Sequence, residues 1–227
     1  MHRLILIGHN GNADDIMDML ESLRKHGTIW EVIGYLDDAG PRLGCLRQVP
    51  WLGPVSDARR YLPASFVLAI GSERTYHRRQ EIFHGSGLSE RDLCTLIHPA
   101  AQVSQTARLD PGTVIHYSSY VGAYVRLETG VYIAPMVHIG HDSCVGAWSV
   151  LAPGVIVSGN VNIGTSVYIG AGAMIRDGVS IGNGSLIGMG AVITKDVPAN
   201  SVVIGNPGRI LRHIHKPHSE PQGSLVS

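Results

Sequence analysis

A histidine followed directly by an acidic residue is the most chemically suggestive pair in this sequence. It stands in the stretch His138-Ile139-Gly140-His141-Asp142. A carboxylate beside an imidazole favours the protonated ring and can fix its tautomer, which improves the histidine as a general base near neutral pH. His141 is therefore a candidate base with Asp142 as its support. An ordinary solvated histidine is the alternative that the same residues allow.

Three segments near the N-terminus carry residues that suit a bound nucleotide. The turn Gly8–Ala13 reads GHNGNA, and the pairs Asp37-Asp38 and Gly71-Ser72 each follow another apolar run. A turn at a helix N-terminus suits a phosphate, while carboxylates accept hydrogen bonds from ribose or sugar hydroxyls. The turn lacks the complete dinucleotide fingerprint, so a tight turn before a capped helix explains it equally well.

The elements around these segments indicate a small Rossmann-like sheet. Strands are predicted over 3–7, 30–36 and 66–70, with an amphipathic helix between the first two. A further helix is predicted over 76–83 and a last strand over 93–97. Ligands of such sheets bind beyond the carboxyl ends of the strands, where all three segments lie. A unit of roughly ninety residues suits a mononucleotide or a nucleotide sugar better than a complete NAD molecule.

A six-residue repeat governs the next part of the chain. From Val103 to Ile193 every sixth residue is Val, Ile or Leu, and the residue two positions earlier is never larger than Val. If about one residue in four is of these three types, sixteen such positions in register have chance odds on the order of one in a billion. The positions are Val103, Leu109, Ile115, Val121, Leu127, Ile133, Ile139, Val145, Leu151, Val157, Ile163, Ile169, Ile175, Ile181, Ile187 and Ile193. This period is typical of a parallel β-helix.

A parallel β-helix restricts where reactive side chains can stand. Each hexapeptide makes one short strand, three make a triangular coil, and the whole repeat makes about five coils stacked about 4.8 Å apart. Since the aliphatic residues fill the interior, a site must lie outside, at an edge, between domains or between subunits. Ile139 points inward by this register, which puts His141 and Asp142 at a corner and His138 on an outer face.

The same register weighs against two other chemistries. Zinc-binding histidines would stack on successive coils, but no histidine stands eighteen residues before or after His141, so no metal is expected from His116, His138 and His141. Cys144 is a conceivable nucleophile for a ping-pong route. It is expected to face outward with no base in obvious reach, which favours a bystander role.

Composition and charge exclude several partner classes. The chain has 18 basic and 18 acidic residues and no block of like charge, so neither nucleic acid nor an anionic membrane is an expected partner. Cys45, Cys94 and Cys144 are odd in number and far apart, which is typical of reduced thiols. No stretch approaches the length of a membrane span or signal peptide, so a cytoplasmic location is expected.

The order of domains and motifs resembles the nucleotide-sugar acetyltransferases. These include the bacillosamine and perosamine N-acetyltransferases and the related sialic acid O-acetyltransferases. The resemblance rests on the Gly8–Ala13 turn, Tyr35-Leu36-Asp37-Asp38, Ala69-Ile70-Gly71, Ile97-His98-Pro99, the His141-Asp142 corner and Gly205-Asn206-Pro207-Gly208-Arg209. It implies an α/β Rossmann-like N-terminal domain followed by a left-handed parallel β-helix, and a homotrimer.

The resemblance also implies roles for individual residues. In that family the corner histidine is the general base and the next acidic residue supports it, which are the places of His141 and Asp142. The nucleotide sugar would contact Asn10, Gly11, Asn12, Asp37, Asp38 and Gly71. Acetyl-CoA would lie in a groove between neighbouring β-helices, with the Gly159 amide receiving the thioester carbonyl. Ala171, Met189, Lys195 and Arg209 would line the rest of that groove.

Three positions depart from the family pattern. Asn12 replaces a histidine of the turn, Val150 replaces a second histidine nine residues after the base, and Ala134 replaces an asparagine seven residues before it. The first departure leaves the nucleotide and the sugar open. The other two lie nearer the acyl transfer.

The function expected is acetyl-CoA-dependent N-acetylation of a nucleotide-linked amino-dideoxy sugar used in polysaccharide biosynthesis. Two alternatives stay open: O-acetylation of a sialic-acid-like or other sugar hydroxyl, and a non-catalytic β-helix that serves as a binding subunit. The expected domains are 1–97 for the nucleotide sugar and 98–196 for the β-helix. A C-terminal segment over 197–215 and a disordered tail over 216–227 follow.

Overall fold

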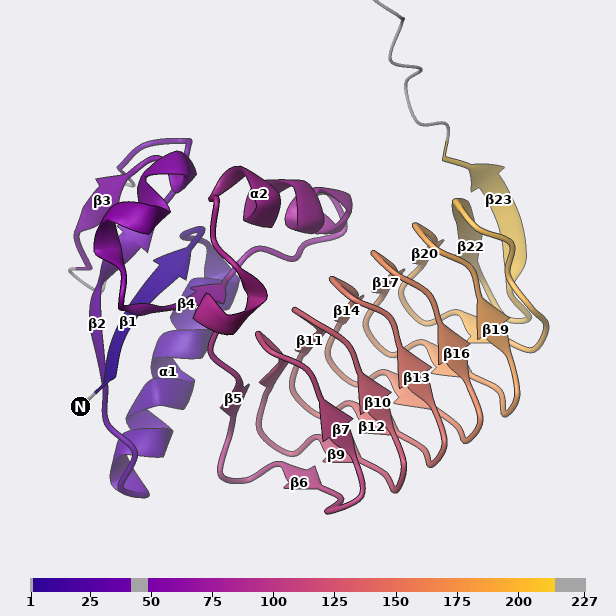
Figure 1. The fold of residues 1–227 in the computed structure, drawn as a ribbon. Coiled ribbons are helices and arrows are strands. Elements are labelled where there is room, and N and C mark those ends of the chain that lie inside the picture. The colour runs from indigo at the N-terminus through magenta and orange to yellow at the C-terminus, as the bar shows by residue number, and fades with distance from the viewer. Residues whose placement is uncertain (1, 42–48, 215–227) are drawn as a thin grey trace, which may run out of the picture.

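The computed structural model describes residues 2–41 and 49–214. The N-terminal domain lies at one end of a long three-sided prism, and residues 209–213 lie at the other end of that prism (Figure 1). Cys45 and the tail expected to be disordered fall outside the described residues. None of the helices within these ranges is long and apolar enough to span a membrane.

The N-terminal domain is a four-stranded parallel sheet with helices packed on it. The strand order is β3-β2-β1-β4, which confirms the Rossmann-like expectation. Leu4 to Ile7 are fully buried because β1 is central and both of its faces are covered. The elements are β1 (His2–Ile7), α1 (Gly11–Lys25), β2 (Trp30–Leu36), β3 (Trp51–Gly53), η1 (Val55–Tyr61), β4 (Ser65–Leu68), η2 (Tyr76–Arg78), α2 (Arg79–Gly85) and η3 (Glu90–Asp92).

The strand predicted over 93–97 is divided between two sheets. Leu93 bridges Phe66 at the edge of the N-terminal sheet, while β5 (Leu96–Ile97) pairs with β8 (Val114–Ile115) in the prism. The segment therefore carries the chain from one domain to the other, so it forms no continuous five-residue strand. The domain limits at 97, 196 and 215 stay predictions.

The prism is a parallel β-helix with three sheets, and each repeat contributes one two-residue strand. The N-terminal domain packs on one of these sheets, which we call the covered face. The covered face holds β5, β8, β11 (Tyr132–Ile133), β14 (Val150–Leu151), β17 (Tyr168–Ile169), β20 (Leu186–Ile187) and β22 (Ser201–Ile204). The apolar face holds β6 (Gln102–Val103), β9 (Tyr120–Val121), β12 (His138–Ile139), β15 (Ile156–Val157), β18 (Met174–Ile175) and β21 (Val192–Ile193). The polar face holds β7 (Arg108–Leu109), β10 (Arg126–Leu127), β13 (Cys144–Val145), β16 (Asn162–Ile163) and β19 (Ser180–Ile181).

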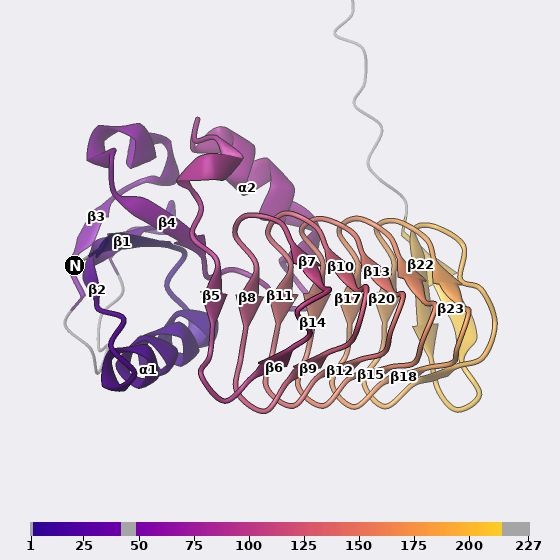
Figure 2. The same ribbon diagram turned by 60° about the horizontal axis from the view of Figure 1, so that its bottom comes forward.

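The repeat positions form the core of the prism. Ile115, Ile139 and Ile169 are among the aliphatic residues at the second position of each strand that are fully buried in a single cluster. Hydrogen bonds to the next coil hold the stack together, as between the His138 N–H and the Val155 carbonyl at 2.9 Å. The inward register predicted from the six-residue period is confirmed. The hairpin of β22 and the antiparallel strand β23 (Arg209–His213) ends the stack (Figure 2).

The N-terminal domain docks on the covered face. Ile16 and Met19 of α1 share one buried cluster with Leu96, Val114 and Tyr132, which point outward from that face. The Tyr76 hydroxyl adds a hydrogen bond to the Gly184 carbonyl at 3.1 Å. The apolar contacts keep the two domains together because separating them would expose the buried side chains to water.

Candidate active site

His141 and Asp142 form a hydrogen-bonded pair on an outer edge of the prism. They stand at the corner between β12 and β13, where Asp142 adopts a left-handed φ of 57°. His141 Nδ1 lies 2.8 Å from Asp142 Oδ2, and the two side chains are 62% and 51% exposed. Since a carboxylate only accepts, Nδ1 donates, and the tautomer that this contact favours leaves the lone pair of Nε2 available to take a proton.

Gly159 lies directly under the His141 ring. A Cβ built on Gly159 would stand 2.8 Å from both Cε1 and Nε2 of His141, so the imidazole edge rests on bare backbone. The Asn160 N–H donates to the His141 carbonyl at 2.9 Å, whereas the Gly159 N–H has no acceptor among the described residues. A basic ring nitrogen and a free backbone donor therefore stand side by side at this edge.

The other residues predicted to contact acetyl-CoA border the apolar face. Ala171 and Met189 lie on successive coils at the edge between the covered and apolar faces, and Gly190 N donates to the Ala171 carbonyl at 2.9 Å. Gly159 lies on the opposite border of the apolar face. Lys195 and Arg209 line a hollow of about 430 Å³ at the far end of that face. The structure thus arranges all five residues around one surface.

Large apolar side chains cover the apolar face. Tyr120, His138, Ile156, Met174 and Val192 are consecutive outward residues in its register. Tyr120 is 40% exposed, Ile156 42% and Met174 48%. Contiguous exposed apolar surface of this kind marks an interaction site.

The residues predicted to contact a nucleotide gather at the carboxyl ends of the N-terminal strands. Asn10 caps α1 by accepting from the Asn12 N–H at 3.0 Å. Both carboxylate oxygens of Asp37 accept backbone N–H groups, from His9 at 3.1 Å and Ala39 at 2.9 Å. Asp38 accepts from the Val55 N–H at 2.8 Å. The paired acids thus fix the loops around the turn, a structural role that the sequence did not predict.

Asn12 and Val150, two of the residues that depart from the family pattern, lie beside each other next to Gly71. A Cβ on Gly71 would lie 3.1 Å from Val150 and 3.3 Å from the Asn12 side-chain amide. Ala134 is buried in the interdomain cluster, beside the same face of the prism. The differences at Asn12 and Val150 are therefore neighbours in space, although 138 positions separate them in the sequence.

The predicted base and the predicted nucleotide site do not meet within one chain. The His141 edge lies between the apolar and polar faces, whereas the N-terminal domain packs on the covered face. In a three-sided prism, an edge stands opposite the face that it does not border. His141 is consequently across the prism from Asn12 and Gly71.

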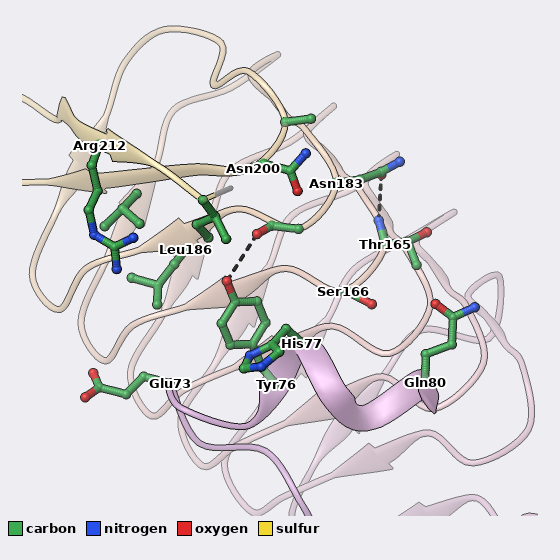
Figure 3. A pocket seen from close by; sticks show the side chains of 14 residues that line it. Glu73, Tyr76, His77, Gln80, Thr165, Ser166, Asn183, Leu186, Asn200 and Arg212 are labelled. Atoms are coloured by element: carbon green, nitrogen blue, oxygen red, sulfur yellow. Dashed lines mark hydrogen bonds between the residues drawn. The ribbon is translucent and has the colours of Figure 1, made fainter. Parts of the chain in front are cut away.

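The structure also has a cleft that sequence reasoning missed. It measures about 720 Å³ and lies between η2 and the last coils. Tyr76, His77 and Gln80 form one wall, and corner residues such as Thr165 and Asn183 form the other (Figure 3). Nothing in the local sequence signals this cleft, because its walls come from segments about ninety residues apart. Among the described residues, no three His, Cys, Asp or Glu side chains gather to hold a metal ion.

Comparison with known proteins identifies relatives of the repeat and of the complete architecture. The family profile "Bacterial transferase hexapeptide (six repeats)" matches residues 160–195. The acetyltransferase domain of PglB from Neisseria gonorrhoeae is 29% identical with a TM-score of 0.80, covering 93% of this chain and 100% of that one. No curated protein matches the sequence.

Two further structures share this architecture. One is a histidine-to-asparagine variant of perosamine N-acetyltransferase from Caulobacter crescentus, in complex with CoA and GDP-perosamine. It is 27% identical, covers 92% of this chain and 97% of that one, and has a TM-score of 0.78. WeeI from Acinetobacter baumannii, at 22% identity and a TM-score of 0.77 over 93% of this chain and 100% of that one, supports the fold alone. The chain is similar to hexapeptide-repeat sugar acetyltransferases in having an α/β domain followed by a left-handed β-helix, and this similarity indicates an acyltransferase.

Proposed function

We propose that the protein transfers the acetyl group of acetyl-CoA to the amine of a nucleotide-linked amino-dideoxy sugar. This proposal rests on the position of His141 Nε2 against Gly159, whose N–H has no hydrogen-bond acceptor among the described residues. Two relatives support the choice of substrates. One structure of the PglB domain contains acetyl coenzyme A, and the perosamine enzyme is solved with CoA and GDP-perosamine.

In the proposed mechanism, His141 acts as a general base in a direct transfer. His141 Nε2 takes a proton from the sugar amine as the nitrogen forms a bond to the thioester carbonyl carbon. The Gly159 N–H donates to the resulting oxyanion, an interaction worth about 3 kcal/mol in other acyl-transfer enzymes. The carbon–sulfur bond then breaks, and His141 returns the proton to the leaving thiolate, which gives an N-acetyl sugar and free CoA.

The environment of Cys144 supports direct transfer over a ping-pong route. Burial, followed by the nearby Glu128 carboxylate, raises the pKa of the Cys144 thiol above its ordinary value. A raised pKa lowers the thiolate fraction at neutral pH, and the thiolate is the nucleophilic form. Cys94 is less reactive still, because burial raises the pKa of its thiol to about 12.

Replacing Gly159 by alanine should lower kcat for acetyl transfer by about 100-fold, within the range reported for removal of an oxyanion donor. The new methyl group would stand 2.8 Å from His141 Nε2 and would displace the ring from the N–H. Steady-state kinetics gives kcat, and titration with acetyl-CoA checks binding. Gly85→Ala, where no atom lies within 4 Å of a new Cβ, is the matched control. Unchanged kcat in Gly159→Ala would remove Gly159 from the reaction.

We further propose that the complete site forms between chains of a homotrimer. A nucleotide sugar on the turn of one chain cannot reach the His141 of the same chain across the prism, so a neighbour must supply the base. The apolar face fits this arrangement because a second copy would bury its exposed side chains. The groove between two neighbouring prisms would run along that face and receive acetyl-CoA. Lys195 and Arg209 would face the phosphates of the bound acetyl-CoA.

Mixed oligomers test the shared site. We expect His141→Asn and Gly71→Val chains to be inactive alone, since one lacks the base and the other fills the turn. Co-expressed in equal amounts, the two variants should recover about a quarter of wild-type activity. Each site needs an intact turn from one chain and an intact base from its neighbour, and about half of the chains carry each. Activity is measured on the purified mixture. No recovery, with mixed oligomers demonstrated, would place both halves of the site in one chain.

The substrate test is a thiol-release assay with acetyl-CoA and a panel of UDP-, GDP- and dTDP-linked amino sugars. Turnover on one of them, with an amide in the product, is the expected result. Turnover on a free sugar hydroxyl but on none of the amino sugars would assign O-acetylation instead.

A further inference from the structure

Arg79 is a buried cation without a carboxylate partner among the described residues. Its side chain is 1% exposed, and its guanidinium donates to the backbone carbonyls of Ile70 and Gly130. Its Nε has no hydrogen-bond partner within the described part of the chain. Burial lowers the pKa of Arg79 to about 10, so the group stays charged at neutral pH. A buried charge that lacks an opposite charge is unfavourable, and proteins rarely keep one without a use.

The charge stands directly behind the proposed nucleotide-sugar site. Arg79 Nη1 is 3.0 Å from the position that a Cβ would take on Gly71, and the Asn12 side-chain amide is 3.3 Å from the same position. Gly71 is near the carboxyl end of β4, and the N-terminus of α1 begins at Gly11. The guanidinium, the amide and the positive end of the α1 dipole therefore converge on one small region, and each favours an anion there.

We propose that Arg79 is the buried counter-charge for the diphosphate of the nucleotide sugar. This inference rests on the proposed function, which supplies the diphosphate. Gly71 has no side chain, so a phosphate on the turn can approach with only backbone between it and the guanidinium. At this depth solvent screens the attraction weakly, and the bound diphosphate supplies the opposite charge that the free protein lacks.

A purely structural role would have a different signature. Tyr76 joins η2 to the Gly184 carbonyl (Figure 3), and Arg79 joins the next helix to Gly130, so both side chains help to dock the domains. If Arg79 acted only as such a clamp, its loss would loosen the loop around Gly71 and weaken every ligand of the turn alike. A counter-charge instead discriminates between ligands with and without phosphates.

The experiment is calorimetric titration of the full chain with UDP, GDP and dTDP, and with the nucleoside of whichever diphosphate binds best. Arg79→Met should weaken the diphosphate at least about tenfold and the nucleoside less than about threefold, since only the diphosphate carries the attracted charge. Arg79→Lys keeps the charge and should keep the preference for the diphosphate. Arg78→Met, an exposed neighbour on the same segment, is the matched control and should change neither affinity.

Four outcomes would overturn the inference. Equal losses for diphosphate and nucleoside would leave Arg79 as a clamp, and unchanged affinities would leave it without a part in binding. If Arg79→Met does not fold, Arg79→Lys decides the matter, because loss of diphosphate preference despite a retained charge contradicts the proposal. Should the wild type bind no nucleoside diphosphate at all, the proposed function fails together with this inference. If the wild type binds a nucleoside diphosphate and Arg79→Met binds it equally well, this inference fails while the proposed function stands.

Discussion

Replacing His141 by asparagine should reduce kcat/KM for acetyl transfer by about 100- to 10,000-fold, the usual contribution of a general base. Asparagine cannot take the proton of the attacking amine, so nitrogen would have to add to the thioester without assistance. The measurement is thiol release under steady-state conditions, with the nucleotide sugar and acetyl-CoA varied in turn. Because the side chain is 62% exposed and belongs to no core cluster, the fold should be unaffected.

Two controls separate lost chemistry from lost binding. Calorimetry should show that His141→Asn still binds acetyl-CoA and the nucleotide sugar. His84→Asn, an exposed histidine near the end of α2, should keep wild-type kinetics. Activity that survives His141→Asn would take the histidine out of the mechanism. A wild-type chain that binds both substrates without turnover would favour the non-catalytic alternative.

The double variant Ile156→Glu with Met174→Glu should convert a trimer to monomers and remove nearly all activity. The two residues are adjacent in the register of the apolar face and are 42% and 48% exposed in the single chain. In the proposed trimer each substitution would bury a carboxylate without a partner, which is strongly unfavourable. Light scattering on a size-exclusion column measures the mass, and the thiol-release assay measures activity at the same protein concentration.

The matched control for that variant lies on the polar face. Asn162→Glu with Ser180→Glu places two new carboxylates at adjacent outward positions of neighbouring coils. Both positions are exposed, so we expect the mass and activity of the wild type. A trimer that survives the apolar-face variant would locate the interface elsewhere. A fully active monomer would contradict the shared site.

The six-residue repeat by itself determined most of the β-helix. A contact between successive coils is set by a fixed spacing of eighteen residues, so the positions of Ile139, His141 and Gly159 relative to one another follow from counting. The inward register holds along the prism for this reason. The parallel N-terminal sheet was likewise predictable, because residues 3–7 read as a strand that a tight turn joins to an amphipathic helix.

Tertiary structure alone decided how the two domains combine. The proximity of Asn12, Gly71, Val150 and Arg79 depends on how α1 and α2 pack on the covered face, and no sequence spacing encodes that packing. The same docking puts the Gly8–Ala13 turn across the prism from His141, and this separation is the reason for proposing a site shared between chains. Local periodicity fixes contacts within a repeating element, whereas contacts between elements depend on complementary surfaces that form only after each element has folded.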